Sequence, residues 1–139
     1  MTFGSAADRA LTDEVAIRRT LSAYCHLCDD GDFRALSEQF TSTGSFGFGK
    51  QVVTGHDEIR AWFERNQSPE HRGKHLTLNT IIDVAGDHAR AVSDFVFLRL
   101  VDGVPVPALA GRYVDDLVRV GDRWVFQRRV AEAMSAGSD

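Results

Sequence analysis

The chain has 139 residues, of which 43% are hydrophobic and 26% are charged, and its formal net charge is −4. This length suits one domain with its own hydrophobic core, so folding requires neither disulfides nor a structural metal. The acidic balance and the absence of a basic stripe argue against nucleic-acid binding.

Both ends of the chain read as loose, which leaves a core of about residues 10–132 within a single domain spanning residues 1–139. No stretch approaches the roughly 18 apolar residues that a membrane-spanning helix needs. The N-terminal residues lack a basic start followed by an apolar run, so they do not read as a secretory signal. We therefore expect a cytoplasmic protein that interacts with neither a membrane nor a nucleic acid.

Helical periodicity dominates the first part of the chain. Thr12 is the expected N-cap of a first helix that ends at Gly31, and Asp32 is the expected N-cap of a short second helix. Residues 44–55 read as two short strands around a turn, and residues 56–67 read as a third helix. The side chains expected to face inward from the three helices are Ile17, Leu21, Tyr24 and Cys28, then Phe33, Leu36 and Phe40, then Ile59, Trp62 and Phe63.

The second half of the chain changes to the pattern of strands. The segments 74–84, 89–100, 106–120 and 123–130 are rich in apolar residues and are joined by short turns that contain Gly and Asp. This pattern predicts an antiparallel meander. Helices followed by a long sheet indicate an α+β domain. If the sheet curves strongly and the helices cover its open side, the result is a cone with an apolar interior.

Residues 24–33, YCHLCDDGDF, concentrate chemically active side chains at the end of the first helix. Cys25 and Cys28 form a C-x-x-C pair, but they lie late in an amphipathic helix and outside a thioredoxin-like context. A structural zinc site would need about four ligands, and the sequence has no second cysteine pair. We therefore interpret both cysteines as core residues and expect no metal.

Three aspartates follow in the same stretch, and two of them have ordinary explanations. Asp32 suits a helix N-cap, and Asp30 suits a solvated loop beside Gly31. Asp29 lies in the last helical turn, where a negative charge opposes the helix dipole, and it is close to the buried face. Either an ion pair at an exposed helix end or a functional role would explain this carboxylate.

The predicted strand 74–84 opens with a candidate partner for Asp29. His75, Asn79 and Ile81 share one face with Thr77 if the alternation is regular. If that face lines the cone, a histidine and an amide project into an apolar cavity. A histidine at the solvent-exposed edge of a strand is the alternative.

Asp94, in the next predicted strand, stands out for a similar reason. It shares a face with three apolar residues, Val92, Val96 and Leu98. A charge in that row lies either at the rim of the sheet or inside the cone, and the pattern alone leaves both positions open.

With these residues in place, the sequence resembles a known family. The segments YCHLCDDGDFRALSEQFT, TGHDEIRAWF, KHLTLNTIIDVAGDHARAVSDF and AGRYVDDLVRVGDRWVFQRR are similar to the SnoaL-like family of the nuclear transport factor 2-like superfamily, over roughly residues 10–132. The resemblance implies a cone-shaped α+β barrel, in which three N-terminal helices pack on a strongly curved, mostly antiparallel mixed sheet around a deep pocket. It also implies a homodimer or a homotrimer.

Within the superfamily, the chain is most similar to a branch that holds scytalone dehydratase, bile-acid dehydratase and hexachlorocyclohexane dehydrochlorinase. In that branch an aspartate at the end of the first helix meets a histidine that starts a central strand, and Asp29 and His75 match this pair. Tyr24 matches a tyrosine that lines the site of the bile-acid enzyme, and Asp94 corresponds to a further acidic pocket residue of that enzyme. The resemblance thus implies four catalytic residues, His75, Asp29, Tyr24 and Asp94.

The chain also departs from that branch. Cys28 stands where scytalone dehydratase has a tyrosine next to its aspartate. Phe46 and Phe48 occupy the segment in which pocket tyrosines assist catalysis, and phenylalanine cannot donate a proton. No counterpart of the second catalytic histidine is evident. The motif therefore specifies the fold more closely than it specifies a substrate.

An aspartate–histidine pair in a dry pocket can abstract a proton from carbon without a metal or a nucleotide. We therefore expect a cofactor-independent lyase of the dehydratase type, in which Asp29 orients His75. Tyr24 would donate a proton and Asn79 would polarise a carbonyl. The expected substrate is a small apolar molecule, such as a polycyclic or steroid-like compound. Its binding site would be formed by Asn79, Phe46, Phe48, Trp62, Phe95 and Phe97.

Two alternatives remain open. The same proton chemistry without a leaving group would make the protein an isomerase of the ketosteroid isomerase type or a polyketide cyclase. A pocket without chemistry would make it a ligand-binding protein or an accessory subunit. The separation of Asp29 and His75 bears on the last case, because the two side chains can act together only within hydrogen-bonding distance.

Overall fold

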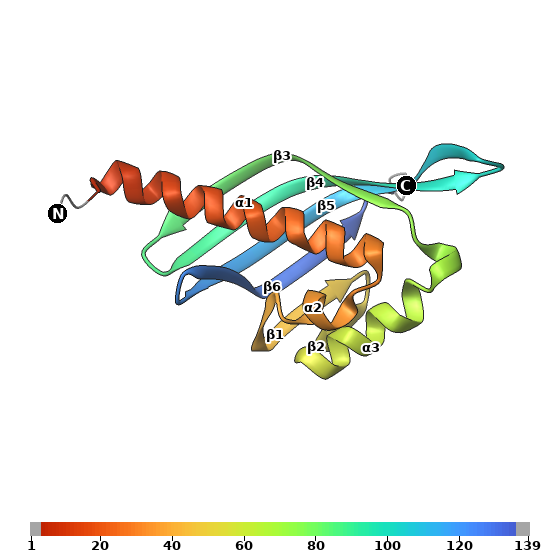
Figure 1. Ribbon diagram of the computed structural model, residues 1–139, viewed down its shortest axis with the longest axis horizontal. Helices are drawn as coiled ribbons and strands as arrows, with labels where there is room; N and C mark the ends of the chain where they lie inside the picture. The colour runs from red at the N-terminus through yellow and green to blue at the C-terminus, as the bar shows by residue number, and fades with distance from the viewer. Residues whose placement is uncertain (1–3, 136–139) are drawn as a thin grey trace.

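The computed structural model describes residues 4–135, which fold into helices packed on one sheet (Figure 1). The helices are α1 (Ala6–Asp30), α2 (Phe33–Ser37) and α3 (His56–Asn66), followed by a short 3-10 turn at Pro69–His71. The strands are β1 (Phe40–Phe48), β2 (Gln51–Thr54), β3 (Lys74–Ala85), β4 (His88–Val101), β5 (Val104–Val120) and β6 (Arg123–Ala133). Residues 1–3 and 136–139, part of the predicted loose ends, lie outside the described residues.

All six strands belong to one mixed sheet with the order β2-β1-β6-β5-β4-β3. β1 pairs with β6 in parallel, and every other neighbouring pair is antiparallel. The predicted meander and the predicted α+β class are therefore confirmed. The sheet stays open rather than closing into a barrel, with β2 and β3 at its two edges (Figure 1).

Two predicted helix boundaries differ from the structure. α1 begins before Thr12, because Ser5 and Asp8 form a capping box in which each side chain accepts the other's backbone N–H. Thr12 lies within the helix and donates its hydroxyl to the Asp8 carbonyl. α2 ends at Ser37, so Phe40 begins β1 instead of extending α2.

The C-terminal end of α1 matches its prediction and positions the candidate site. Gly31 has φ 76°, a left-handed conformation that glycine adopts without strain, and the chain leaves the helix there. The Asp32 side chain accepts the Ala35 backbone N–H and so caps α2. α1 therefore stops with Asp29 in its last turn, beside the start of β3 (Figure 1).

The core lies between the helices and the inner face of the sheet, which is the face that the helices cover (Figure 1). Side chains alternate between the two faces of a strand. On β4 the buried side chains are Ala89, Ala91, Ser93, Phe95 and Phe97. Asp94, which lies between two of them, therefore points to the outer face.

A β-bulge in β3 breaks the alternation predicted from His75 to Ile81. Asn79 has φ 54° and is the extra residue of a register shift that ends at Ile81. Asparagine tolerates this left-handed conformation better than most residues do. His75 and Thr77 are half-buried against α1, whereas Asn79 and Ile81 are exposed. The predicted shared face therefore ends at the bulge, and Asn79 points to the outer face.

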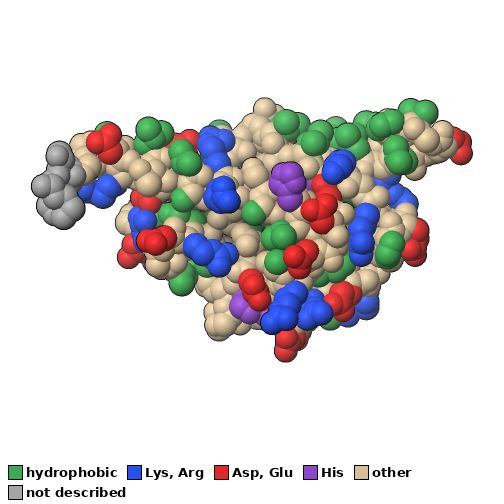
Figure 2. Space-filling model, viewed as in Figure 1, with side chains coloured by type: hydrophobic (Ala, Val, Ile, Leu, Met, Phe, Trp, Pro, Cys, Tyr) green, Lys and Arg blue, Asp and Glu red, His purple; other side chains and the backbone are tan. Residues whose placement is uncertain are grey.

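Figure 2 shows hydrophobic side chains along the edge formed by β3 and the hairpin between β4 and β5. Exposed apolar side chains that lie together in this way are typical of interaction surfaces. The predicted homodimer or homotrimer stays a prediction, and this edge offers an apolar surface for it. The exposed residues there are Leu76, Leu78, Ile81, Leu100, Val101 and Val104.

Asp13 ties the first half of α1 to β5 and β6. Its Oδ2 accepts a hydrogen bond from Arg119 Nη2 at 2.8 Å, and its Oδ1 accepts one from Trp124 Nε1 at 3.3 Å. The hydrogen bond from Arg119 lowers the pKa of Asp13, although burial acts in the opposite direction. The ionised carboxylate is therefore the form that the fold favours.

Replacing Asp13 by Asn should lower the melting temperature at pH 7 by roughly 3–6 °C, the effect of losing one charge-assisted hydrogen bond. A lowered pKa means that ionised Asp13 stabilises the fold above the ordinary aspartate pKa of about 4. This contribution is lost as the pH falls through the folded-state value. Thermal unfolding of both proteins across this pH range should therefore show the difference shrinking toward acid.

The control for this experiment is Asp87→Asn, which removes the exposed second partner of Arg119 and should have a smaller effect. A stability difference for Asp13→Asn that stays constant across the pH series would contradict the assigned role of the Asp13 charge.

Candidate active site

The side chains of Asp29 and His75 meet where α1 ends and β3 begins. His75 Nδ1 lies 2.6 Å from Asp29 Oδ1, and the His75 backbone N–H donates to the two carboxylate oxygens at 3.2 and 3.1 Å. Only 10% of the His75 side chain and 7% of the Asp29 side chain are exposed. The carboxylate holds the histidine at both its ring and its backbone. An Nδ1 that donates its proton leaves Nε2 as the proton acceptor.

This contact accounts for the negative charge in the last turn of α1. A carboxylate at this end of a helix opposes the dipole, and its burial adds a desolvation penalty. A ring N–H and a backbone N–H of His75 offset both effects by donating to Asp29. The position of Asp29 is therefore explained by β3 rather than by α1 alone.

Replacing Asp29 by Asn should remove the short hydrogen bond to the His75 ring, while the Asn oxygen can still accept the His75 backbone N–H. In the wild-type protein, the Nδ1 proton should give a proton NMR resonance downfield of the backbone amides, because it donates to a carboxylate. The resonance should move toward the amides in Asp29→Asn and stay unchanged in the neighbouring control Asp30→Asn. An identical resonance in all three proteins would contradict the assigned partner.

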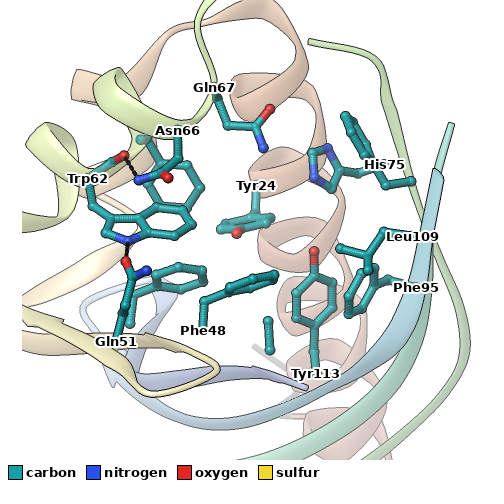
Figure 3. A pocket seen from close by; sticks show the side chains of 14 residues that line it. Tyr24, Phe48, Gln51, Trp62, Asn66, Gln67, His75, Phe95, Leu109 and Tyr113 are labelled. Atoms are coloured by element: carbon teal, nitrogen blue, oxygen red, sulfur yellow. Dashed lines mark hydrogen bonds between the residues drawn. The ribbon is translucent and has the colours of Figure 1, made fainter. Parts of the chain in front are cut away.

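The ring of His75 faces a cavity of about 230 Å³ between the inner face of the sheet and helices α1 and α3 (Figure 3). Tyr24 projects into it from α1. Each aromatic residue that the sequence assigned to the binding site lines the cavity, namely Phe46, Phe48, Trp62, Phe95 and Phe97. An apolar chamber with a few polar groups is typical of small-molecule sites.

Amide side chains supply further polar groups to the cavity wall. Gln51 Oε1 accepts the Trp62 indole N–H at 2.6 Å, and Asn66 Nδ2 donates to the Trp62 carbonyl at 2.8 Å. The contact with Gln51 fixes the indole ring in the wall, and the contact with Asn66 occupies the Asn66 amide nitrogen. The amide of Gln67 points toward the space between Tyr24 and His75 (Figure 3). Gln67 is therefore the amide best placed to meet a ligand.

Asn79 and Asp94 lie on the outer face of the sheet, contrary to the expectation that they belong to the site. Asp94 Oδ1 accepts from Arg112 Nε at 2.9 Å, and its Oδ2 accepts from Asn79 Nδ2 at 3.1 Å. These hydrogen bonds, the one from Arg112 foremost, lower the pKa of Asp94. Neither residue lines the cavity, because Asp94 alternates with buried Phe95 and the bulge turns Asn79 outward.

Tyr113 is a cavity residue that the sequence reasoning missed. Its ring stacks on Phe95 with the centroids 4.4 Å apart, and its hydroxyl points into the cavity (Figure 3). Within residues 4–135, no hydrogen bond joins the hydroxyl of Tyr113 or of Tyr24 to another protein group. Burial raises the pKa of both phenols, so both stay protonated at neutral pH. The cavity therefore contains two available hydroxyl donors.

Beneath the two tyrosines lies an ion pair that is completely withdrawn from solvent. Arg129 Nε and Nη2 donate to the carboxylate oxygens of Asp115 at 2.9 and 3.3 Å, and both side chains are 0% exposed. Burial disfavours the charge on Arg129, but Asp115, Tyr113 and Tyr24 together outweigh this effect and raise the pKa of Arg129. Burial raises the pKa of Asp115, and Arg129 opposes that rise. The guanidinium therefore stays charged in the core.

Removing one member of this pair should destabilise the protein far more than removing both. Arg129→Met leaves an uncompensated buried carboxylate and should lower the free energy of unfolding by about 3–5 kcal/mol. The double variant Asp115→Leu/Arg129→Met should lie within about 1–2 kcal/mol of the wild type, because apolar groups replace the pair. Urea unfolding followed by tryptophan fluorescence measures both values. Equal losses in the two variants would contradict this account.

Among residues 4–135, no group of three or more His, Cys, Asp or Glu side chains is arranged to hold a metal ion. In the same part of the chain, no helix is both long and apolar enough to cross a bilayer. Cys25 and Cys28 are buried free thiols, and burial raises the pKa of both. Buried thiols of this kind are chemically inert, which agrees with their interpretation as core residues.

Fold and site together define an α+β protein in which helices and a mixed sheet enclose an apolar cavity. The chain belongs to the SnoaL-like domain family, whose family model matches residues 9–130. This match confirms the resemblance drawn from the sequence segments. Among curated proteins, no relative matches the chain.

Several solved structures share this fold. A variant of Rv3472, a protein of unknown function from Mycobacterium tuberculosis, has a TM-score of 0.89 at 23% identity, covering 95% of this chain and 78% of that one. A provisionally named scytalone dehydratase from Novosphingobium aromaticivorans has a TM-score of 0.80 at 22% identity, with 93% and 89% covered. The beta subunit of a provisionally named aromatic-ring-hydroxylating dioxygenase from the same organism has a TM-score of 0.78 at 18% identity, with 92% and 93% covered. Likeness at these identities establishes the fold and not the activity.

Proposed function

We propose that this protein is a cofactor-independent lyase of the dehydratase type that acts on a small cyclic ketone. The observation that carries the proposal is the 2.6 Å hydrogen bond between Asp29 and His75 beside an aromatic cavity. A histidine oriented by a buried carboxylate is suited to act as a general base. The fold shared with the provisionally named scytalone dehydratase agrees with this proposal.

The reaction begins when His75 Nε2 takes a proton from the carbon beside the substrate carbonyl. The electrons of the broken C–H bond move toward the carbonyl oxygen and form an enolate. The enolate then expels the β hydroxyl as the carbonyl re-forms and a carbon–carbon double bond forms between the α and β carbons. The imidazolium returns the proton to this hydroxyl, so water leaves and His75 regains its starting state. Asp29 stabilises the transient imidazolium through the Nδ1 hydrogen bond. A base positioned in this way contributes about 10²–10⁴-fold to the rate.

The hydroxyls of Tyr24 and Tyr113 would bind the substrate carbonyl. As the proton leaves carbon, negative charge moves onto the carbonyl oxygen. Donors already in place stabilise this charge strongly, because the mostly apolar walls lower the effective dielectric. Tyr113 would thus polarise the carbonyl, the role that the sequence suggested for Asn79, because Asn79 lies outside the cavity.

The volume of the cavity limits the size of the substrate. Its 230 Å³ lies below the roughly 300–1,000 Å³ that is typical of sites for drug-sized ligands. It lies above the roughly 150 Å³ of an apolar cavity that accommodates benzene. A compound with one or two rings therefore suits this site better than the steroid-like substrate that the sequence suggested.

An isomerase or cyclase is the second candidate function. The same base and the same two hydroxyls, Tyr24 and Tyr113, would serve a substrate that forms an enolate and has no group to expel. A purely ligand-binding role is less well supported, because it does not require a carboxylate that fixes one nitrogen of a cavity histidine. The provisionally named dioxygenase beta subunit shares the fold. An accessory role is therefore one outcome that the test must distinguish.

His75→Gln and Asp29→Asn should each lower kcat/KM for dehydration by about 10²-fold or more, because each removes part of the general base. The substrates are one-ring and two-ring ketones with a β hydroxyl, and the conjugated product is followed by its ultraviolet absorbance. The matched control is Asp94→Asn, which removes an aspartate from the outer face and should keep the wild-type rate.

Unchanged activity in His75→Gln would refute the proposed base. Exchange of the α hydrogen for deuterium without loss of water would favour the isomerase. Binding of these ketones with neither exchange nor dehydration would favour the non-catalytic alternative.

A further inference from the structure

The buried Asp115–Arg129 pair touches the candidate site through two tyrosine rings. The guanidinium carbon of Arg129 lies 3.6 Å from the centroid of the Tyr113 ring and 4.2 Å from that of the Tyr24 ring. The two rings meet edge to face with their centroids 5.9 Å apart, and both line the cavity. One layer of phenol rings therefore separates the cation from the cavity.

The hydrogen bonding of Arg129 is incomplete. Nε and Nη2 are occupied by Asp115, whereas Nη1 is buried and has no hydrogen-bond partner among the described residues. A buried donor without a partner weakens a fold. Apolar residues that replace a buried ion pair often give equal or greater stability. Stability alone therefore does not explain a full positive charge at this position.

We propose that Arg129 is a positioning residue, whose charge acts through the Tyr24 and Tyr113 rings to make the cavity prefer a ligand with an anionic oxygen. The ligand class is an enolate or a phenolate with one or two rings. This inference rests on the proposed function, in which the substrate ketone becomes an enolate with negative charge on its oxygen.

The physical effect follows from the stacked geometry. A cation over the face of a phenol ring attracts its π electrons, so the hydroxyl becomes a stronger donor. The effect is enhanced because Arg129 and both rings are buried and in direct contact, where the effective dielectric is low. Asp115 already holds the guanidinium in place, so no rearrangement is needed when charge develops on a ligand. The charge on Arg129 also lowers the pKa of both tyrosines, against the larger effect of burial.

The test uses 4-nitrophenol, a one-ring acid whose absorption spectrum distinguishes the phenol from the phenolate. Titration with wild-type protein and with Asp115→Leu/Arg129→Met gives the dissociation constants of both forms of the probe. The ratio of the two constants should favour the phenolate about tenfold more in the wild type than in the double variant, which corresponds to one pKa unit of the bound probe.

Two further variants make the result specific. Asp94→Asn/Arg112→Gln removes one charge of each sign from the outer face and should keep the wild-type ratio. Tyr113→Phe keeps the ion pair and removes one hydroxyl, so it should lose phenolate preference to a similar extent. It also serves as the test if the double variant does not fold, as judged by circular dichroism.

Equal ratios in the wild type and the folded double variant would overturn the proposal, as would a wild type that does not bind the phenolate. If the double variant does not fold, an unchanged ratio in Tyr113→Phe would overturn it. The readout is separate from the lyase assay. Phenolate preference without dehydration refutes the proposed reaction alone. Dehydration with unchanged ratios refutes this inference alone.

Discussion

The contact between the end of α1 and the start of β3 is the constraint on which the candidate site depends. Gly31 ends the helix in a left-handed conformation, and Asp29 in the last turn bonds both the ring and the backbone of His75. Rather more than one turn earlier in the same helix, Tyr24 projects into the cavity and covers Arg129. α1 therefore presents the Asp29 carboxylate to His75 and the Tyr24 hydroxyl to the cavity. The point at which the helix ends fixes the position of both groups.

Two features of this arrangement weaken the fold when each is considered alone. Asp29 places a negative charge at the C-terminal end of a helix, and Arg129 holds a buried Nη1 without a partner. Departures from local preference of this kind concentrate at functional sites, where other contacts compensate for them. Each residue contacts side chains that line the same cavity, Asp29 through His75 and Arg129 through the two tyrosines. Their coincidence supports a chemical role for the cavity more strongly than either residue does.

The elements of the fold follow from sequence pattern, because strand alternation, Gly and Asp turns and helix caps are local signals. The bulge at Asn79 has no such local signal in the sequence. Its one extra residue moves the following side chains to the other face of the strand. The inward position of the Asp115 carboxylate, in contrast, could have been predicted from the sequence. Asp115 and Asp116 are adjacent in a strand, so one of them must point inward. Its partner Arg129 becomes evident only when β5 and β6 are in register.

The sheet contains two aspartate–arginine pairs, and in each pair the two residues lie directly opposite each other on neighbouring strands. The two pairs have different surroundings. Asp94 and Arg112 face outward with 34% and 59% of their side chains exposed, so water screens their attraction and the pair adds little stability. Asp115 and Arg129 face inward with no exposure, where the same charges act at low dielectric on rings that line the cavity. Because neighbouring residues of a strand point to opposite faces, a shift of β5 by one residue would turn Asp115 outward and Arg112 inward, and so separate both pairs. The electrostatic character of the cavity is therefore set by strand register, which in turn is fixed by the hydrophobic pattern of the whole sheet.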